Sequence, residues 1–215
     1  MFICCDIHLN PGDNNYNEGF LKFMHWNLNS ISAHNFARVS LLEAYNALHD
    51  FQLIAITESA LKPSDKDDKI QINGYACIRK DLEPNVSHGG VLLYYKQNLA
   101  VKTRQDLETC PNLIVLELSI SKKKVFFIIV YRKFGQTYDE FVSFKENLRE
   151  ILKKMNQEKG FCTVITGDQN AHLKMWWEGN EDNLYGTSLQ SVFDEQGLFQ
   201  LVNQPTYINI YITYT

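Results

Sequence analysis

Four apolar stretches of this sequence run into side chains that could hold a cation or a phosphate. They end at Asn27-Leu28-Asn29, at Glu58, at Tyr131 and at Gly167-Asp168-Gln169-Asn170. In α/β proteins, strand ends carry most ligand sites, because a side chain there has rigid support and reaches solvent. Two carboxylates with several amides form an all-oxygen set, which suits a hard cation such as magnesium. The amide and phenol groups also suit a phosphate.

An ordinary turn is the alternative at each of these positions, because Asn, Asp and Glu commonly follow strands. Two spacings favour a site over a turn. Residues two apart lie on one face of a strand, so Asn27 and Asn29 should share a face. Asp168 and Asn170 should do the same. Paired polar residues on one face at two strand ends are harder to explain as turns.

The elements that must position these groups alternate between strands and helices. Helical spacing of apolar residues predicts helices over 36–49 and 141–155, and a last helix is predicted over 188–195. The first helix should bury one stripe, made of Phe36, Val39, Leu42 (or Leu41), Tyr45 and Leu48. Strands are predicted over 20–29, 51–57, 75–79, 91–95, 113–120, 125–131, 162–166 and 207–214, with a hairpin at 121–124. This order predicts an α/β sandwich of two sheets with helices outside.

Length and composition indicate one globular domain. The chain has 215 residues, of which 45% are hydrophobic and 21% charged, which excludes a disordered chain. We expect residues 1–19 to be a poorly ordered leader and residues 20–215 to form the domain. The net charge of -4 argues against a general DNA-coating protein but permits a local basic rim.

The cysteines and the apolar runs indicate a nuclear or cytoplasmic protein that is not secreted. Five cysteines without a CxxC pair argue against both a disulfide framework and a structural zinc site. The apolar start is too short for a signal peptide, and no run is long enough to cross a membrane. The sequence also lacks the Walker A, HExxH and GxSxG motifs, so the NTPase, zinc protease and serine hydrolase classes have no support.

Read in order, six motifs resemble the successive signatures of the endonuclease/exonuclease/phosphatase superfamily. They are Trp26-Asn27-Leu28-Asn29-Ser30, Thr57-Glu58-Ser59, Gly89-Gly90-Val91, Tyr131-Arg132, Gly167-Asp168-Gln169-Asn170-Ala171-His172 and Gln204-Pro205-Thr206. The tryptophans after His172 and the later Gly-Leu, Asn and Pro-Thr order are similar to those of LINE-type (non-LTR) retrotransposon endonucleases. The resemblance covers roughly residues 20–207 and implies a four-layer sandwich of two mixed β-sheets flanked by helices.

The resemblance implies a DNA-nicking phosphodiesterase that uses Mg²⁺, with Mn²⁺ as a possible substitute. Glu58 would hold the metal, and Asn29 would be a second ligand on the metal or water side. Asp168 would orient or deprotonate the attacking water. DNA would be the substrate, and a reverse transcriptase domain is expected in the intact gene product, without membrane association.

Other roles follow from the same resemblance. Asn27 and Asn170 would hydrogen-bond the phosphate and neighbouring catalytic groups, and Tyr131 would present its phenol to the phosphate. Thr206 would contact the DNA backbone or support the site. His172 would touch the DNA or the phosphate, with a plain loop position as the alternative.

The end of the sequence departs from the family pattern. The family closes with an Asp after the Pro-Thr position and then a Ser-Asp-His, whereas this sequence has no Asp after Asp194 and no His after His172. We therefore expect a fold that is incomplete at its C-terminus, without its last strands, and a chain with weak or no activity. A non-catalytic remnant or binding module is the main alternative. Another is a superfamily member with a different substrate, such as an AP endonuclease or a lipid or inositol phosphatase.

Overall fold

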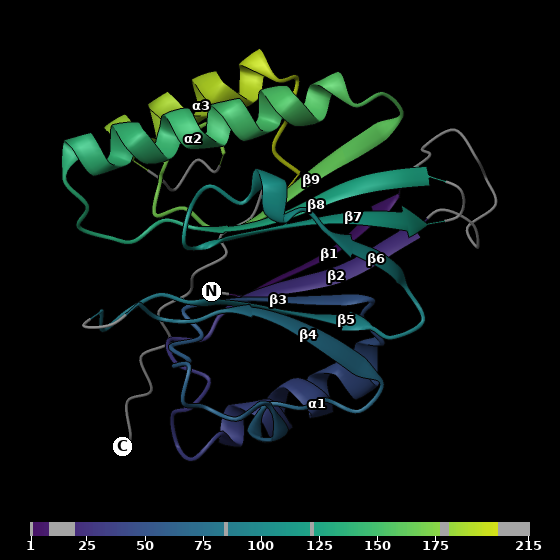
Figure 1. The fold of residues 1–215 in the computed structure, drawn as a ribbon. Coiled ribbons are helices and arrows are strands. Elements are labelled where there is room, and N and C mark those ends of the chain that lie inside the picture. The colour runs from purple at the N-terminus through teal and green to yellow at the C-terminus, as the bar shows by residue number, and fades with distance from the viewer. Residues whose placement is uncertain (1, 9–19, 84–85, 121–122, 177–180, 202–215) are drawn as a thin grey trace, which may run out of the picture.

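Two β-sheets lie face to face between outer layers of helices (Figure 1). The computed structural model describes residues 2–8, 20–83, 86–120, 123–176 and 181–201. The first sheet has the order β1-β2-β3-β5-β4, and the second has the order β6-β7-β8-β9. The strands of the first are β1 (Phe2–His8), β2 (Phe20–Asn27), β3 (Leu53–Thr57), β4 (Tyr75–Lys80) and β5 (Val91–Lys96). Those of the second are β6 (Ala100–Thr103), β7 (Leu113–Ile120), β8 (Lys123–Tyr131) and β9 (Phe161–Asp168).

Helices cover the outer face of each sheet, which gives the four layers (Figure 1). Helix α1 (Ala37–His49) packs on the five-stranded sheet, whereas α2 (Tyr138–Gln157) and α3 (Leu184–Glu195) cover the other. Single 3₁₀ turns lie at Asp67–Lys69 and Gln105–Leu107. The predicted α/β sandwich of two mixed sheets is confirmed. None of the helices in the described ranges is both long and apolar enough to cross a membrane.

Parallel pairing aligns the strand ends that carry the candidate groups. Strand β2 pairs in parallel with β3, so that Asn27 lies opposite Thr57. Strand β8 pairs in parallel with β9, so that Tyr131 lies opposite Asp168. Helices α1 and α2 make the two crossovers. Within each pair, both strands therefore have their carboxyl ends side by side. The second strand of each pair carries a carboxylate at or just beyond that end.

The central strands are buried on both faces, which explains why they read as continuous apolar runs. Every residue of β3 is buried, and so are the last seven residues of β8. The side chains on one face of each of these strands fill the space between the sheets. They include Leu53, Ala55, Phe127 and Ile129. The opposite sets pack against the helices. This double burial fixes the strand ends rigidly.

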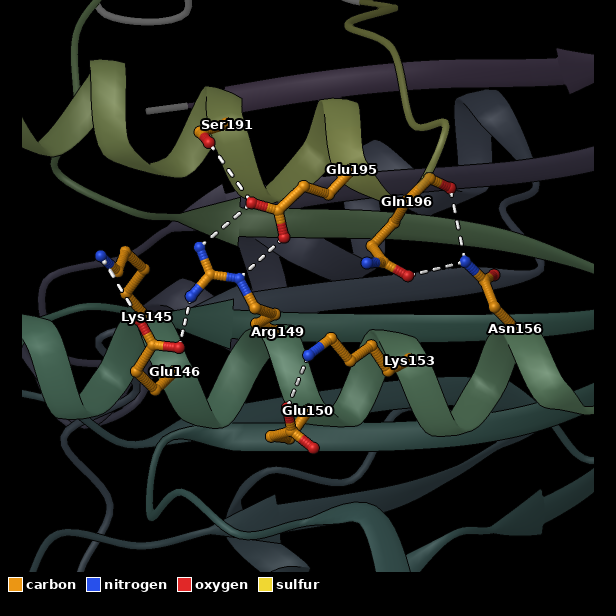
Figure 2. Close-up of polar contacts among 9 residues, drawn as sticks. All are labelled: Lys145, Glu146, Arg149, Glu150, Lys153, Asn156, Ser191, Glu195 and Gln196. Atoms are coloured by element: carbon orange, nitrogen blue, oxygen red, sulfur yellow. Dashed lines mark hydrogen bonds and ion pairs between the residues drawn. The ribbon is translucent and has the colours of Figure 1, made fainter.

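Helix α2 begins earlier than the apolar pattern predicts, because a capping box starts it. The Thr137 side chain accepts from the Glu140 backbone N–H, while the Glu140 carboxylate accepts from the Thr137 N–H. The apolar residues whose spacing predicted this helix, namely Phe141, Phe144, Leu148, Ile151 and Leu152, are all buried. Helix α3 also begins earlier than predicted, at Leu184, with Asn183 as its cap. On the outer surface, Arg149 of α2 pairs with Glu195 of α3 at 2.8 Å, and Asn156 Nδ2 donates to Gln196 Oε1 just past the end of α3 (Figure 2).

The structure differs from the sequence analysis in several local features. In α1, Val39 and Leu42 are buried, but Leu48 is 80% exposed, because it lies on the same outer face of the helix as the exposed Leu41, seven residues earlier. The prediction that Leu48 belongs to the buried stripe is therefore wrong. Strands β1 and β6 were not predicted. Residues 2–8, assigned to a leader, form β1 and pair antiparallel with β2. The strand predicted over 207–214 lies outside the described residues.

Candidate active site

One side-chain amide joins the two carboxylates across the sheets. Asn27, the last residue of β2, donates from Nδ2 to Glu58 Oε1 at 2.8 Å and to Asp168 Oδ2 at 2.7 Å. Asp168 ends β9 in the other sheet, whereas Glu58 directly follows β3. The Asn27 Oδ1 atom accepts from the backbone N–H of Asn29 at 3.1 Å. Both hydrogens of the amide and its oxygen are thus engaged, and the two carboxylates share one place in the fold.

Three residues of this site have left-handed backbone, which side chains with a Cβ rarely adopt. The φ angles are 46° at Asn29, 52° at Glu58 and 47° at Asn170. Such a conformation costs about 1–2 kcal/mol per residue and clusters at functional sites, where the surroundings impose it. The strands end at Asn27 and Asp168, so the period-two argument does not extend to Asn29 and Asn170. The backbone turns at these residues instead of continuing a strand.

The Asp168 carboxylate receives a hydrogen bond on each oxygen. Oδ2 accepts from Asn27, and Oδ1 accepts from the backbone N–H of Asn170 at 3.1 Å. The Asn170 side chain donates from Nδ2 to the carbonyl of Arg132 at 2.7 Å. Each carboxylate oxygen keeps a further lone pair. Asp168 is therefore fixed in orientation and still able to accept a proton.

Tyr131 lies beside Glu58 and Asp168, and its phenol stays protonated. Its ring is buried. Burial raises the pKa of its phenol well above the usual range, and so do the charge of Glu58 and a hydrogen bond to that carboxylate. A neutral phenol donates its O–H, so Tyr131 is a hydrogen-bond donor beside the two carboxylates.

A buried polar pair lies beneath the site on the same faces of β2 and β3. His25 and Thr57 are both fully buried, and His25 Nε2 lies 3.0 Å from Thr57 Oγ1. Burial lowers the pKa of His25 to about 3, so the imidazole is neutral near pH 7. This pair supports Asn27 and Glu58 from below without adding a charge.

Among the described residues, the predicted site residue His172 is not brought into this cluster. His172 is exposed, and its backbone N–H donates to Asn183 Oδ1 at 3.3 Å. Thr206 lies outside the described residues. Asn29 itself is exposed at the rim, with its backbone N–H held by Asn27.

Asn112 belongs to the site region but was not predicted. Its Oδ1 accepts from the Gly90 N–H at 3.2 Å, and its carbonyl accepts from the Tyr131 N–H at 2.9 Å. The carbonyl of Gly90 in turn accepts from the Ser59 N–H at 3.2 Å. Asn112 thereby ties Tyr131 to the segment after Glu58. The predicted hairpin of 113–120 with 125–131 places residue 112 opposite the end of Tyr131's strand, and this register is the signal that could have identified it.

The donor set suits magnesium. Among the residues that the structure describes, no group of three or more His, Cys, Asp or Glu residues is placed to hold a metal. Zinc sites usually need three or four such protein ligands. Magnesium keeps several waters and is typically held by one or two carboxylates. Glu58, a single carboxylate with amide side chains near it, fits that requirement.

Comparisons with known proteins bear on the family and on the fold. Residues 125–212 match the model of a family described as endonuclease-reverse transcriptase. The structure resembles the endonuclease domain of TRAS1, a telomere-specific non-LTR retrotransposon, with a TM-score of 0.66 and 18% identity over 86% of this chain and 76% of that domain. The chain has the endonuclease/exonuclease/phosphatase fold.

Two AP endonucleases have a similar fold. The enzyme from Leishmania major has a TM-score of 0.66 and 14% identity over 82% of this chain and 66% of its own. The enzyme from Archaeoglobus fulgidus has a TM-score of 0.57 and 15% identity over 81% and 70%. No curated protein sequence matches the chain. The fold and the resemblance predicted from the six motifs are thus confirmed.

Proposed function

We propose that this chain is a metal-dependent phosphodiesterase that nicks DNA, as the endonuclease part of a retrotransposon polyprotein. The observation that carries the proposal is the Asn27 amide, which holds Glu58 and Asp168 together at the ends of β2, β3 and β9. The match of residues 125–212 to the endonuclease-reverse transcriptase family supports the polyprotein context, with a reverse transcriptase domain in the intact gene product.

Each residue of the cluster has a distinct role in the proposed reaction. Glu58 and Asn29 would hold Mg²⁺, or Mn²⁺ in its place. When bound, the ion polarises a phosphoryl oxygen and stabilises the leaving oxygen. Asp168 accepts a proton from the water whose oxygen bonds to phosphorus. The P–O bond to the 3′-oxygen breaks, and that oxygen takes a proton from solvent, which leaves a 3′-hydroxyl and a 5′-phosphate. Asn27 fixes both carboxylates, which is the kind of preorganisation that catalysis by positioning requires.

Three further residues complete the proposal. Tyr131, whose phenol is hydrogen-bonded to Glu58 in this structure, would donate its hydrogen to a phosphate oxygen when DNA is bound. Asn170 orients Asp168 through its backbone N–H. For His172 and Thr206, contact with DNA stays a prediction from the family resemblance.

Nicking of a supercoiled plasmid tests the proposal, because a single cut relaxes the whole circle. We expect slow conversion to open circles by excess protein in Mg²⁺, loss of conversion in EDTA, and recovery with Mg²⁺ or Mn²⁺. Glu58→Gln should abolish it. Glu117→Gln, which removes a half-buried carboxylate of β7 that pairs with Lys102, is the matched control and should keep it. Nicking that persists in EDTA or in Glu58→Gln contradicts the site. Complete absence of nicking favours a non-catalytic binding module.

Cleavage at abasic sites is the second candidate, favoured by the equal TM-score of the Leishmania major AP endonuclease. The same assay separates the two when a plasmid carrying abasic sites is compared with an intact one. A rate on abasic DNA more than 100-fold above that on intact DNA assigns the chain to the second function. Similar rates on both assign it to the first.

A further inference from the structure

Arg132 carries a buried charge whose hydrogen bonds in the described structure go to backbone carbonyls instead of to a carboxylate. Its exposed fraction is 2%. Arg79, Arg104 and Arg149 pair with carboxylates, whereas the hydrogen bonds of the Arg132 guanidinium in the described structure go to backbone carbonyls. Burying a charge without a counter-ion is unfavourable. An apolar residue would fit a stable core better, so the position of Arg132 calls for another explanation.

The carbonyls that Arg132 binds belong to the segment that carries Asp168 and Asn170. Its Nε donates to Gln169 O at 2.6 Å, and its Nη2 donates to Asn170 O. Its backbone N–H donates to Asp168 O at 2.9 Å, and its own carbonyl accepts from Asn170 Nδ2 at 2.7 Å. Arg132 is thus bonded to each residue from 168 to 170, where the chain leaves β9 and becomes left-handed.

Two aromatic rings hold the guanidinium in place. The Arg132 Cζ atom lies 4.2 Å from the ring centroid of Tyr185 in α3 and 5.6 Å from that of Phe141 in α2. The two rings contact each other edge to face at 4.7 Å. Stacking on aromatic faces is favourable for guanidinium and restricts its movement. Arg149 and Glu195, on the outer surface, pair α2 with α3, the helix that carries Tyr185 (Figure 2).

We infer that Arg132 is the positioning residue for the proposed general base. Its guanidinium sets the backbone of 168–170 so that the Asn170 N–H meets Asp168 Oδ1 while Asp168 Oδ2 faces Asn27. A planar fork with several N–H groups can reach two carbonyls at once, which the single ammonium of lysine does not match. The catalytic part of this inference rests on the proposed function, whereas the geometric part does not.

Amide hydrogen exchange measured by NMR tests the geometric part without any activity. Arg132→Met and Arg132→Lys should each speed exchange of the Asn170 amide at least 10-fold relative to that of the Ile54 amide in the buried strand β3. Tyr185→Leu, which keeps Arg132 and removes a stacked ring, should speed it by a smaller factor, and this milder variant serves if Arg132→Met does not fold. Arg104→Lys is the matched control, because Arg104 also lies over a ring and is mostly buried, yet pairs with Asp106 and Glu158. It should leave Asn170 unchanged.

Nicking kinetics test the catalytic part. Arg132→Lys should lower kcat at least 10-fold with KM within a factor of three, because the base is misplaced while DNA binding is intact. Unchanged Asn170 exchange in Arg132→Lys and in Tyr185→Leu overturns the inference. Faster exchange with unchanged kcat also overturns it as a statement about catalysis. Faster exchange in a chain that never nicks leaves the positioning role standing and counts against the proposed function alone.

Discussion

Asp168→Asn is expected to lower the nicking rate at least 100-fold, since general acid–base catalysis contributes about 100–10,000-fold. Asparagine keeps the size of the side chain but cannot take the proton of the attacking water. It also faces two donors, Asn27 Nδ2 and the Asn170 N–H, with only one oxygen. One of those hydrogen bonds must therefore be lost. The measurement is the initial rate of open-circle formation with protein in excess over plasmid.

The metal separates the role of Asp168 from that of Glu58. If Asp168 acts as the base, Asp168→Asn should change the Kd for Mn²⁺ less than 10-fold. Glu58→Gln should raise that Kd much more, because it removes the proposed metal ligand. Asp194→Asn, which alters an aspartate of α3 bonded to Gln190, is the control and should change neither quantity. A normal nicking rate in Asp168→Asn contradicts the assigned base. Equal losses of Mn²⁺ affinity in both site variants would instead make Asp168 a metal ligand.

Gly167→Ala is expected to destabilise the fold by about 3 kcal/mol or more, the range of severe core changes. Gly167 has a φ of +140° and pairs with Val130 in the β8–β9 ladder. An added Cβ would lie 1.8 Å from the Val130 carbonyl oxygen and 2.8 Å from its carbonyl carbon. Both neighbours are backbone inside a buried ladder, so neither can move without separating β8 from β9. The same separation would displace Asp168, the next residue.

Gly160→Ala provides the matched control for this stability measurement. Gly160 also has a positive φ, +83°, but no atom lies within 4 Å of an added Cβ. Only the left-handed strain should count there, about 1 kcal/mol. The free energy of unfolding in urea, followed by tryptophan fluorescence, should therefore fall much further for Gly167→Ala than for Gly160→Ala. Equal losses would show that the close approach to Val130 is not a constraint.

Much of the fold could be predicted because periodicity and double burial are local signals. The strand 113–120 was predicted with its observed bounds, and of the buried residues of α2 all but Met155 were predicted. Capping residues moved the start of α2 to Tyr138, ahead of its first buried residue. Strands β1 and β6 are edge strands, and their sequences carry no strong alternation. Local pattern could not identify them.

The residues that form the site could be predicted from the sequence, but the hydrogen bonds that join them could not. The residues that end β2, β3, β8 and β9 were recognisable from the motifs, yet nothing local tells that one amide reaches both carboxylates. That bridge depends on how the two sheets pack. The left-handed turns at Asn29 and Asn170 also escaped the period-two argument, because hydrogen bonds from distant residues impose them. Arg132 stood in a motif, but its side-chain role emerges only once β8 and β9 lie side by side.

Line broadening by Mn²⁺ in ¹⁵N-labelled protein tests most directly whether Glu58 and Asp168 line a common ion-binding pocket. The amides of 27–29, 58–60 and 168–170 come from three separate strand ends, and Mn²⁺ broadens amides near it. The account predicts that all three segments broaden together at one Mn²⁺ concentration, and that Glu58→Gln removes the effect from all three. Broadening at 58–60 without 168–170, or at clearly different concentrations, would contradict it.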